Sequence, residues 1–349
     1  MPPSAPITLH YLQHCVRDIS RTTSEMRAWG FESENVRLSG LYPRCVALRQ
    51  GEITLIATEP GSATPMLGWL RQHGDGVADV ALATPDITQV FQRAVAAGAE
   101  VVRDLAGGPV AASAVIASPA GIVHTLTQHH PENPLVHLPF LGTLSVSPAP
   151  SPAGLRRVDH LAIVCDRDSL EATESFYHRA FGFETIFDEE IAAGPSAMRS
   201  VVVSSGSGVV FTLVTPVGAP GQLDYFLDRH RGPGVQHVAY ETHDIVTTVS
   251  TLQQAGLTFA PTPDAYYAQL PARLGRLRRH DVEALRSLGV LADRDHGGEL
   301  YQVFGSSQHP RRTYFSEVVE RDGATTFGKG NIRALFEALD SSLGAGVAP

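Results

Sequence analysis

Two histidines and one glutamate carry the strongest chemical signal in this sequence. His160 lies at the start of the apolar run VDHLAIV, His237 lies within GVQHVAY, and Glu317 lies within RTYFSEVVER. Two neutral imidazoles and one carboxylate suit a divalent metal, and with coordination positions left open they form the 2-His-1-carboxylate face of non-haem Fe(II) oxygenases. Zinc hydrolases use the same donors. The residue types therefore predict a metal centre, but they do not identify the metal.

Each of these residues also has a purely structural interpretation. A single histidine in a strand more often packs in a core than binds a metal. Glu317 fits an exposed strand face as well, because Ser316 and Glu320 are also polar. Against that, a carboxylate between Phe315 and Val318 is costly to bury without a partner. The residues alone leave both interpretations open.

An internal repeat indicates which elements must position these side chains. Residues 73–87, HGDGVADVALATPDI, match residues 231–245, RGPGVQHVAYETHDI, in the frame G-x-G-V-x-x-V-A-x-x-T-x-D-I. In each copy the apolar middle predicts a strand, and the Asp-Ile pair opens a helix that ends at Gly98 or Gly256. A repeated order of features at this spacing indicates two similar domains.

The fold class that follows is α+β, with strand-helix-strand units on a mostly antiparallel sheet in each domain. We predict a first domain at residues 1–144, a Pro/Ser-rich linker at 145–157 and a second domain at 158–349. Near the end of the chain, apolar residues follow the i, i+3, i+4, i+7 spacing of an amphipathic helix: Ile332, Leu335, Phe336 and Leu339. A lid over the second domain is one role for that helix.

The repeat also shows which polar residues are present in only one half. The counterpart of His237 is Asp79, and the counterpart of His160 is Tyr11. A histidine pair that occurs only in the second half predicts that the chemistry takes place there.

Composition excludes several classes of partner. The chain has 349 residues and a net charge of -9, without a cluster of Lys and Arg, so we expect no nucleic-acid partner. No apolar run of about 18 residues exists, so we expect no membrane span. The N-terminus does not resemble a signal peptide, and the isolated cysteines Cys15, Cys45 and Cys165 disfavour disulfides. These features predict a cytoplasmic protein.

Several segments resemble the 4-hydroxyphenylpyruvate dioxygenase and 4-hydroxymandelate synthase family of the vicinal oxygen chelate superfamily. They are LRQGEITLIATEP, VDHLAIV, GPGVQHVAYETHDI, PDAYYAQL, HGGELYQVF and YFSEVVERDGATTFGKGNIRALFEALD, which together extend over nearly the whole chain. The resemblance implies two tandem vicinal-oxygen-chelate domains of βαβββ repeats, with outer helices and a C-terminal gate helix. It implies Fe(II) on His160, His237 and Glu317, an aryl α-keto acid and O2 as substrates, and a homodimer.

The resemblance also implies roles for residues around the metal. Catalytic positions carry over to Ser200, Gln222 and Gln302. Substrate-binding positions carry over to seven residues, most of them apolar: Phe187, Val202, Leu213, Phe304, Phe315, Phe327 and Asn331. Without the family, the aromatic residues among them are equally well explained as ordinary core.

Details of the sequence favour the mandelate synthase branch, which hydroxylates the benzylic carbon of 4-hydroxyphenylpyruvate with loss of CO2. The dioxygenase branch, which forms homogentisate, usually carries a Pro-x-Asn-Glu-Pro stretch where this chain reads VVFTLVTPVGAPGQ. Gly221 also replaces the Ser that commonly precedes Gln222. Arg199, Leu213 and Ser316 depart from both branches, and the Arg and Leu changes leave open a different α-keto acid.

Three alternatives remain at this point. The first is homogentisate formation by the same metal centre. The second is a binding protein that keeps the fold without the chemistry. The third is a zinc or manganese hydrolase or isomerase of the same superfamily.

Overall fold

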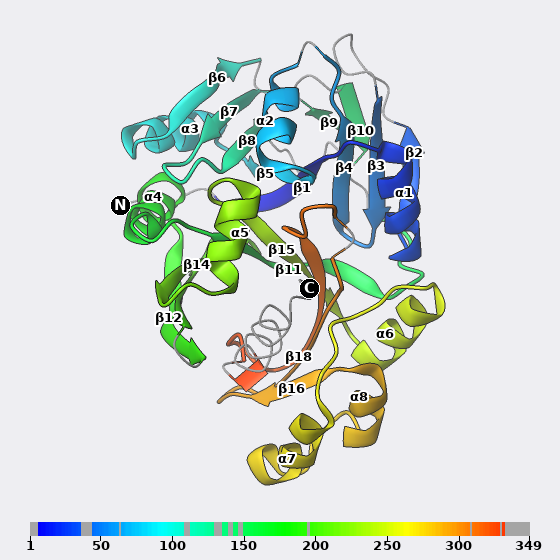
Figure 1. Ribbon diagram of the computed structural model, residues 1–349. Coiled ribbons are helices and arrows are strands. Elements are labelled where there is room, and N and C mark those ends of the chain that lie inside the picture. The colour runs from blue at the N-terminus through cyan, green and yellow to red at the C-terminus, as the bar shows by residue number, and fades with distance from the viewer. Residues whose placement is uncertain are drawn as a thin grey trace.

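Two eight-stranded sheets, one in each half of the chain, form the framework of the structure, a computed structural model (Figure 1). The structure describes residues 6–35, 44–62, 64–107, 112–128, 135–138, 142–145, 149–193, 196–307, 309–328 and 330–331. The predicted helix at 332–339 lies outside these residues.

The first half alternates strands with three helices. Its elements are β1 (Thr8–Cys15), α1 (Ile19–Ala28), β2 (Glu32–Asn35), β3 (Arg44–Gln50), β4 (Ile53–Glu59), α2 (Pro65–His73), β5 (Gly76–Thr84), α3 (Ile87–Ala96), β6 (Glu100–Ala106), β7 (Ser113–Ala117) and β8 (Val123–Gln128). A separate hairpin follows, made of β9 (Leu135–Leu138) and β10 (Gly142–Ser145).

The second half repeats this order and adds two helices. Its elements are β11 (Leu155–Val164), α4 (Leu170–Phe181), β12 (Glu184–Ala193), β13 (Ser196–Ser204), β14 (Val210–Gly218), α5 (Gln222–His230), β15 (Gly234–Thr242), α6 (Ile245–Gln254), α7 (Asp264–Leu274), α8 (Val282–Leu288), β16 (Leu291–Arg294), β17 (Glu299–Phe304) and β18 (Phe315–Asp322). Strand β11 begins three residues before the predicted boundary at 158; the division into domains remains a prediction.

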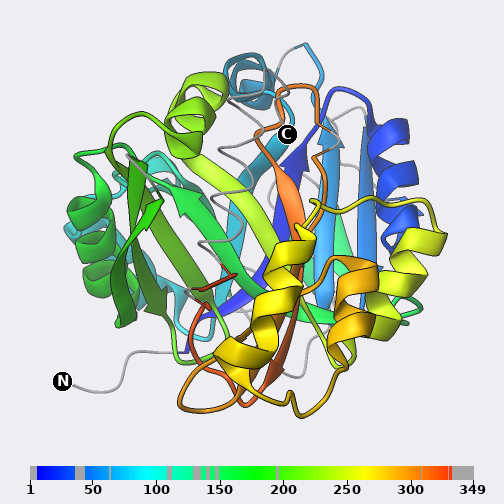
Figure 2. The same cartoon turned by 60° about the horizontal axis from the view of Figure 1, so that its bottom comes forward.

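The two sheets have the same topology. The strand orders are β2-β3-β4-β1-β5-β8-β7-β6 and β12-β13-β14-β11-β15-β18-β17-β16. Neighbouring strands are antiparallel except for the pairs β1–β4, β5–β8, β11–β14 and β15–β18. This arrangement confirms the predicted α+β class with two tandem domains of βαβββ units. Helix α7 contacts β16 and α8, and the described residues of the first half form no counterpart of these two helices, which are yellow to orange in Figure 2.

The repeated Asp-Ile pairs start helices for a physical reason. Asp86 and Asp244 precede α3 and α6, and each side chain accepts a hydrogen bond from a backbone N–H of the first turn. Such a cap satisfies one of the donors that a helix N-terminus leaves free. Gly98 and Gly256, just after these helices, adopt positive φ of 100° and 91°, where a glycine has no steric penalty.

The two halves share a continuous apolar core. Trp29 of the first half packs its ring 6.2 Å from that of Tyr240 in the second, and both are buried. Arg311, in the connection between β17 and β18, donates to Arg71 O at the end of α2 and to Arg229 O at the end of α5, each at 3.1 Å. A cation there opposes the negative ends of two helix dipoles, so it ties both halves to the segment that leads into β18.

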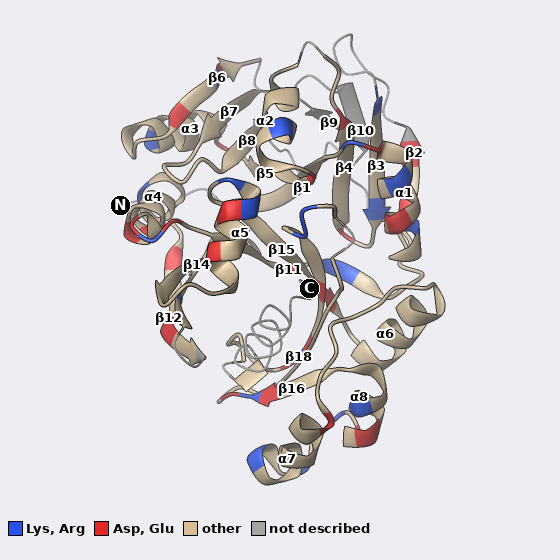
Figure 3. Ribbon diagram, in the orientation of Figure 1, with Lys and Arg blue, Asp and Glu red and all other residues tan. Residues whose placement is uncertain are grey.

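Charged residues are spread over the outer elements of both halves (Figure 3). Among the helices that the structure describes, none is long and apolar enough to cross a membrane. The expected lack of a nucleic-acid partner and the cytoplasmic location remain predictions from the sequence.

Candidate metal centre

Three neighbouring strands bring His160, His237 and Glu317 to one face of the second sheet. Ala239 of β15 lies opposite His160 of β11 on one side and opposite Glu317 of β18 on the other. His237 is two residues from Ala239, and side chains two apart in a strand share a face. The small Ala239 side chain between them leaves room for the larger groups to converge.

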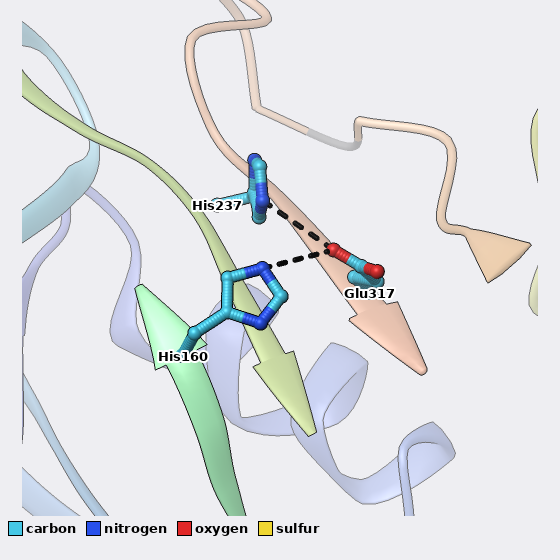
Figure 4. Close-up of side chains that lie close together, drawn as sticks. All are labelled: His160, His237 and Glu317. Atoms are coloured by element: carbon cyan, nitrogen blue, oxygen red, sulfur yellow. Dashed lines mark ion pairs between the residues drawn. The ribbon is translucent and has the colours of Figure 1, made fainter. Parts of the chain in front are cut away.

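The three side chains point toward one another, and their donor atoms lie close together (Figure 4). Glu317 Oε2 lies 3.6 Å from His160 Nε2 and 3.4 Å from His237 Nε2, and one ligand atom from each residue lies within 4.8 Å of the others. His160 is 3% exposed and Glu317 1%. A buried carboxylate facing two imidazole nitrogens is the arrangement that a bound divalent cation stabilises.

The electrostatics of the cluster also fit a cation. Burial raises the pKa of Glu317 to about 7. Burial, and then the neighbouring His160, lower the pKa of His237 well below its ordinary value. Both effects disfavour the charged forms of the side chains. A divalent ion would stabilise the carboxylate and bind the neutral imidazole, so the residues present fit the metal.

A set of hydrogen bonds surrounds two of the three residues. Gln302 Nε2 donates to Glu317 Oε1 at 2.9 Å, and Asn331 Nδ2 donates to Gln302 Oε1 at 2.9 Å. Asp159 Oδ1 lies 2.8 Å from His160 Nδ1. Burial alone would raise the pKa of Asp159, but the charge and hydrogen bonds of Arg321 and those of His160 lower it below its ordinary value. The carboxylate of Asp159 is therefore ionised and accepts from His160.

A largely apolar cavity opens beside the three residues. Six of the residues predicted from the family line it: Ser200, Gln222, Gln302, Phe304, Phe315 and Phe327. Gln222 is the first residue of α5, and Phe315 stacks on His237 with ring centroids 4.8 Å apart. Phe327 packs edge-on against His160 at 5.1 Å. The catalytic and substrate roles of these residues remain predictions.

Two further predicted residues lie next to the cavity lining. Asn331 does not line the cavity but holds Gln302, as described above. Phe187 of β12 packs against Phe327, with ring centroids 6.2 Å apart. Both therefore support residues that line the cavity.

The other two predicted substrate-binding residues outside the cavity lining, Leu213 and Val202, are buried in the protein interior. Leu213 is a correction: it is fully buried in the main core, and Thr212 and Val214 on either side of it face the cavity instead. A one-residue difference in register moves a side chain to the other face of a sheet. Val202 is fully buried and also absent from the lining.

Sequence reasoning missed six residues of the lining: Ala162, Met198, Thr212, Val214, Leu223 and Gln236. Alternation along the strands could have found several of them. Once Ser200 is placed at the cavity, Met198 two residues earlier follows, and Val214 pairs directly with Ser200. The hydroxyls of Ser200 and Thr212 are buried and make no hydrogen bond to the part of the chain that the structure describes.

The unusual residues Arg199 and Ser316 lie away from the cavity. Arg199 forms ion pairs with Asp188 and Glu171. Ser316 lies 3.4 Å from the hydroxyl of Tyr314. The contacts of Arg199 therefore give no support to the expectation that its presence indicates a different α-keto acid.

Comparison with known proteins agrees with the fold. Residues 159–273 match the family described as Glyoxalase/Bleomycin resistance protein/Dioxygenase superfamily. A 4-hydroxyphenylpyruvate dioxygenase from Coccidioides posadasii is 32% identical, with 84% of this chain and 81% of that protein covered. The human 4-hydroxyphenylpyruvate dioxygenase-like protein is 34% identical, with 85% and 86% covered.

A solved structure is similar over the whole chain. It is a mutant of 4-hydroxymandelate synthase from Streptomyces coelicolor, with a TM-score of 0.86 and 35% identity, covering 98% of this chain and all of that one. Fold and donor set thus define a tandem-domain dioxygenase of the vicinal oxygen chelate type. The chain belongs to the 4-hydroxyphenylpyruvate dioxygenase and 4-hydroxymandelate synthase family, whose members depend on non-haem iron.

Proposed function

We propose that this chain uses Fe(II) and O2 to decarboxylate 4-hydroxyphenylpyruvate and hydroxylate its benzylic carbon, releasing 4-hydroxymandelate and CO2. The observation that carries the proposal is the convergence of His160, His237 and Glu317 at the wall of a largely apolar cavity. The three residues would hold the iron, which supplies redox chemistry and open positions for the α-keto acid and O2.

The remaining residues of the cavity suit an aryl substrate. Phe304, Phe315 and Phe327 present apolar faces against which an aromatic ring packs and which keep water from the reacting carbon. Gln302 is held by Glu317 and Asn331, so its amide has a fixed orientation at the cavity wall. Positioning of the reacting carbon is the contribution that a rigid cavity makes to such a reaction.

The hydroxyls of Ser200 and Thr212, which have no hydrogen-bond partner among the described residues, support a substrate with a polar group. A buried hydroxyl without a hydrogen bond loses the free energy of its contact with water. A ring hydroxyl group could satisfy these hydroxyls, whereas an unsubstituted ring could not. This contrast favours 4-hydroxyphenylpyruvate over phenylpyruvate.

Homogentisate formation is the second candidate, since curated relatives at 32% identity are named as 4-hydroxyphenylpyruvate dioxygenases. The similarity to a mandelate synthase over the whole chain, and the absence of the Asn-Glu pair between Phe211 and Gln222, favour the mandelate product.

Product identification tests the proposal directly. The protein is loaded anaerobically with Fe(II), mixed with ascorbate, O2 and 4-hydroxyphenylpyruvate, and the product is identified by mass spectrometry. We expect 4-hydroxymandelate with matching CO2 release and O2 uptake. Homogentisate would replace the proposal by the second candidate, and no product from any aryl keto acid would refute both. Activity with zinc or manganese in the absence of O2 uptake would instead indicate a hydrolase or isomerase.

A further inference from the structure

Asp159, the residue before His160, is a buried carboxylate held from two sides. Its side chain is 8% exposed. On one side Oδ1 lies 2.8 Å from His160 Nδ1. On the other, Arg321 of β18 makes a two-pronged contact, with Nε donating to Oδ2 at 2.7 Å and a terminal nitrogen donating to Oδ1 at 2.9 Å. The parallel fork of a guanidinium fixes a carboxylate in both position and plane.

Arg321 is itself held by the segment that follows β18. It donates to the carbonyl oxygen of Thr326 at 2.6 Å, and its guanidinium lies over the ring of Phe327, 5.0 Å from the centroid. Phe327 in turn packs edge-on against His160. The four side chains His160, Asp159, Arg321 and Phe327 thus form a closed ring of contacts, in which the guanidinium has little freedom to move.

This ring determines which nitrogen of His160 is available to a metal. Because both oxygens of Asp159 accept from Arg321, the contact with His160 is one in which Nδ1 carries the proton and donates. That tautomer leaves the Nε2 lone pair directed toward Glu317 and His237. A hydrogen bond from the second ring nitrogen to a carboxylate orients a histidine ligand and makes it a stronger donor.

His237 has no comparable support among the described residues. Its Nδ1 lies 3.3 Å from the amide oxygen of Gln236, a long contact with a neutral group. Its ring is oriented instead by stacking on Phe315. The two histidines are therefore unequal, and an anionic anchor supports only His160.

We infer that Arg321 is a positioning residue for the metal, which acts through Asp159 to hold His160 in its metal-binding orientation. The inference rests on the proposed metal centre and deepens it. Among the described contacts Arg321 reaches His160 through the Asp159 carboxylate and through the ring of Phe327, and Asp159→Asn tests the carboxylate route alone. Lysine at this position keeps the charge but loses the fork.

Titration of the full-length apo-protein with Co(II), followed by its visible absorption, tests this role. We expect Arg321→Lys to bind Co(II) about 10- to 100-fold more weakly than the unchanged protein, the range seen when such supporting partners are lost. Arg294→Lys is the matched control, because Arg294 also pairs with a buried carboxylate, Glu299, and donates to the carbonyl oxygen of Arg276 at 3.0 Å. We expect its Co(II) affinity to be unchanged.

A second measurement separates positioning from a loss of folding. In apo-protein labelled with ¹⁵N-histidine, we expect His160 to carry its proton on Nδ1, and Arg321→Lys to lose that single form while circular dichroism shows the fold intact. Asp159→Asn, which keeps the size of the side chain, should weaken Co(II) binding in the same way.

The possible outcomes distinguish a failure of the inference about Arg321 from a failure of the proposed metal centre. If Arg321→Lys and Asp159→Asn bind Co(II) as tightly as the unchanged protein, the inference is wrong and the metal centre stands. If the unchanged protein binds no Co(II), both the metal centre and the inference are wrong. An equal loss of affinity in Arg294→Lys would show that any broken arginine–carboxylate pair has this effect, which also overturns the inference.

Discussion

Three equivalent strand positions in the two sheets are occupied by different residue types. Tyr11 lies opposite Ala81 in the first half, as His160 lies opposite Ala239 in the second. Asp79 is the counterpart of His237. Thr125 precedes Leu126, which pairs with Leu82, so Thr125 takes the place that Glu317 has in the second half.

In the first half these groups satisfy one another. The backbone N–H of Thr125 donates to Asp79 Oδ1 at 2.8 Å, and its hydroxyl makes a short hydrogen bond to Oδ2. Burial raises the pKa of Asp79 to about 6, although the hydrogen bonds from Thr125 act to lower it. In the second half, by contrast, two imidazole nitrogens and a carboxylate oxygen converge within 4.8 Å of one another, at a spacing that a metal ion can occupy. Lone pairs that converge in this way repel one another and are stabilised by a cation. The hydrogen-bonded Asp79 and Thr125 of the first half need no cation.

The largest effect should come from removing one of the converging lone pairs. His237→Ala leaves two donors, and we expect metal affinity and kcat/KM to fall by about 1000-fold or more, since a metal contributes several kcal/mol to such a reaction. Co(II) titration and O2 uptake measure both. Near-normal turnover by this variant would show that the metal is held elsewhere.

The pH dependence of metal affinity should distinguish the two halves, because only in the second half is the buried carboxylate a candidate metal ligand. Below its ordinary pKa of 4.5, Glu317 is protonated in both the folded and the unfolded chain; from there to about 7 only the folded apo-protein keeps the proton. The stability of the apo-protein therefore falls as pH rises through this window, and a metal that displaces the proton gains affinity, about tenfold per pH unit below pH 7. Co(II) titrations from pH 5.5 to 8 measure this slope; a flat profile would contradict the raised pKa.

A smaller effect is expected from the two buried hydroxyls of the cavity lining, Ser200 and Thr212. Ser200→Ala and Thr212→Val each remove one hydroxyl, and we expect KM for 4-hydroxyphenylpyruvate to rise about 3- to 10-fold, the cost of one hydrogen bond. KM for phenylpyruvate is the internal control and should change little. If both substrates respond equally, these hydroxyls do not contact the ring substituent.

The smallest effect on the metal should follow a change in the first half. Asp79→Ala leaves the N–H and hydroxyl of Thr125 without their acceptor, and we expect a loss of about 1–3 kcal/mol in the free energy of unfolding. Metal affinity should not change. Urea denaturation and Co(II) titration test the two parts, and weaker Co(II) binding would mean that the halves are coupled at this point.

Much of this protein was predictable from the chain alone. The repeated G-x-G-V frame predicted two similar α+β domains, because strand alternation and Asp helix caps are local properties. The unequal polar residues of the repeat, His160 and His237 against Tyr11 and Asp79, pointed to the half in which the candidate metal ligands converge. The sequence around Glu317 could not identify it as a candidate ligand, because a glutamate on an exposed strand face would show the same pattern.

Tertiary structure alone decided which side chains share the cavity with those ligands. Leu213 looked like a substrate-binding residue, but the pairing of β14 with β13 turns it into the core and brings Thr212 and Val214 to the cavity. The link between Asp159 and Arg321 spans 162 residues and exists only because β11, β15 and β18 lie side by side. Local sequence determines whether a segment becomes a strand; register and strand order determine what each side chain meets, and these depend on packing over the whole chain.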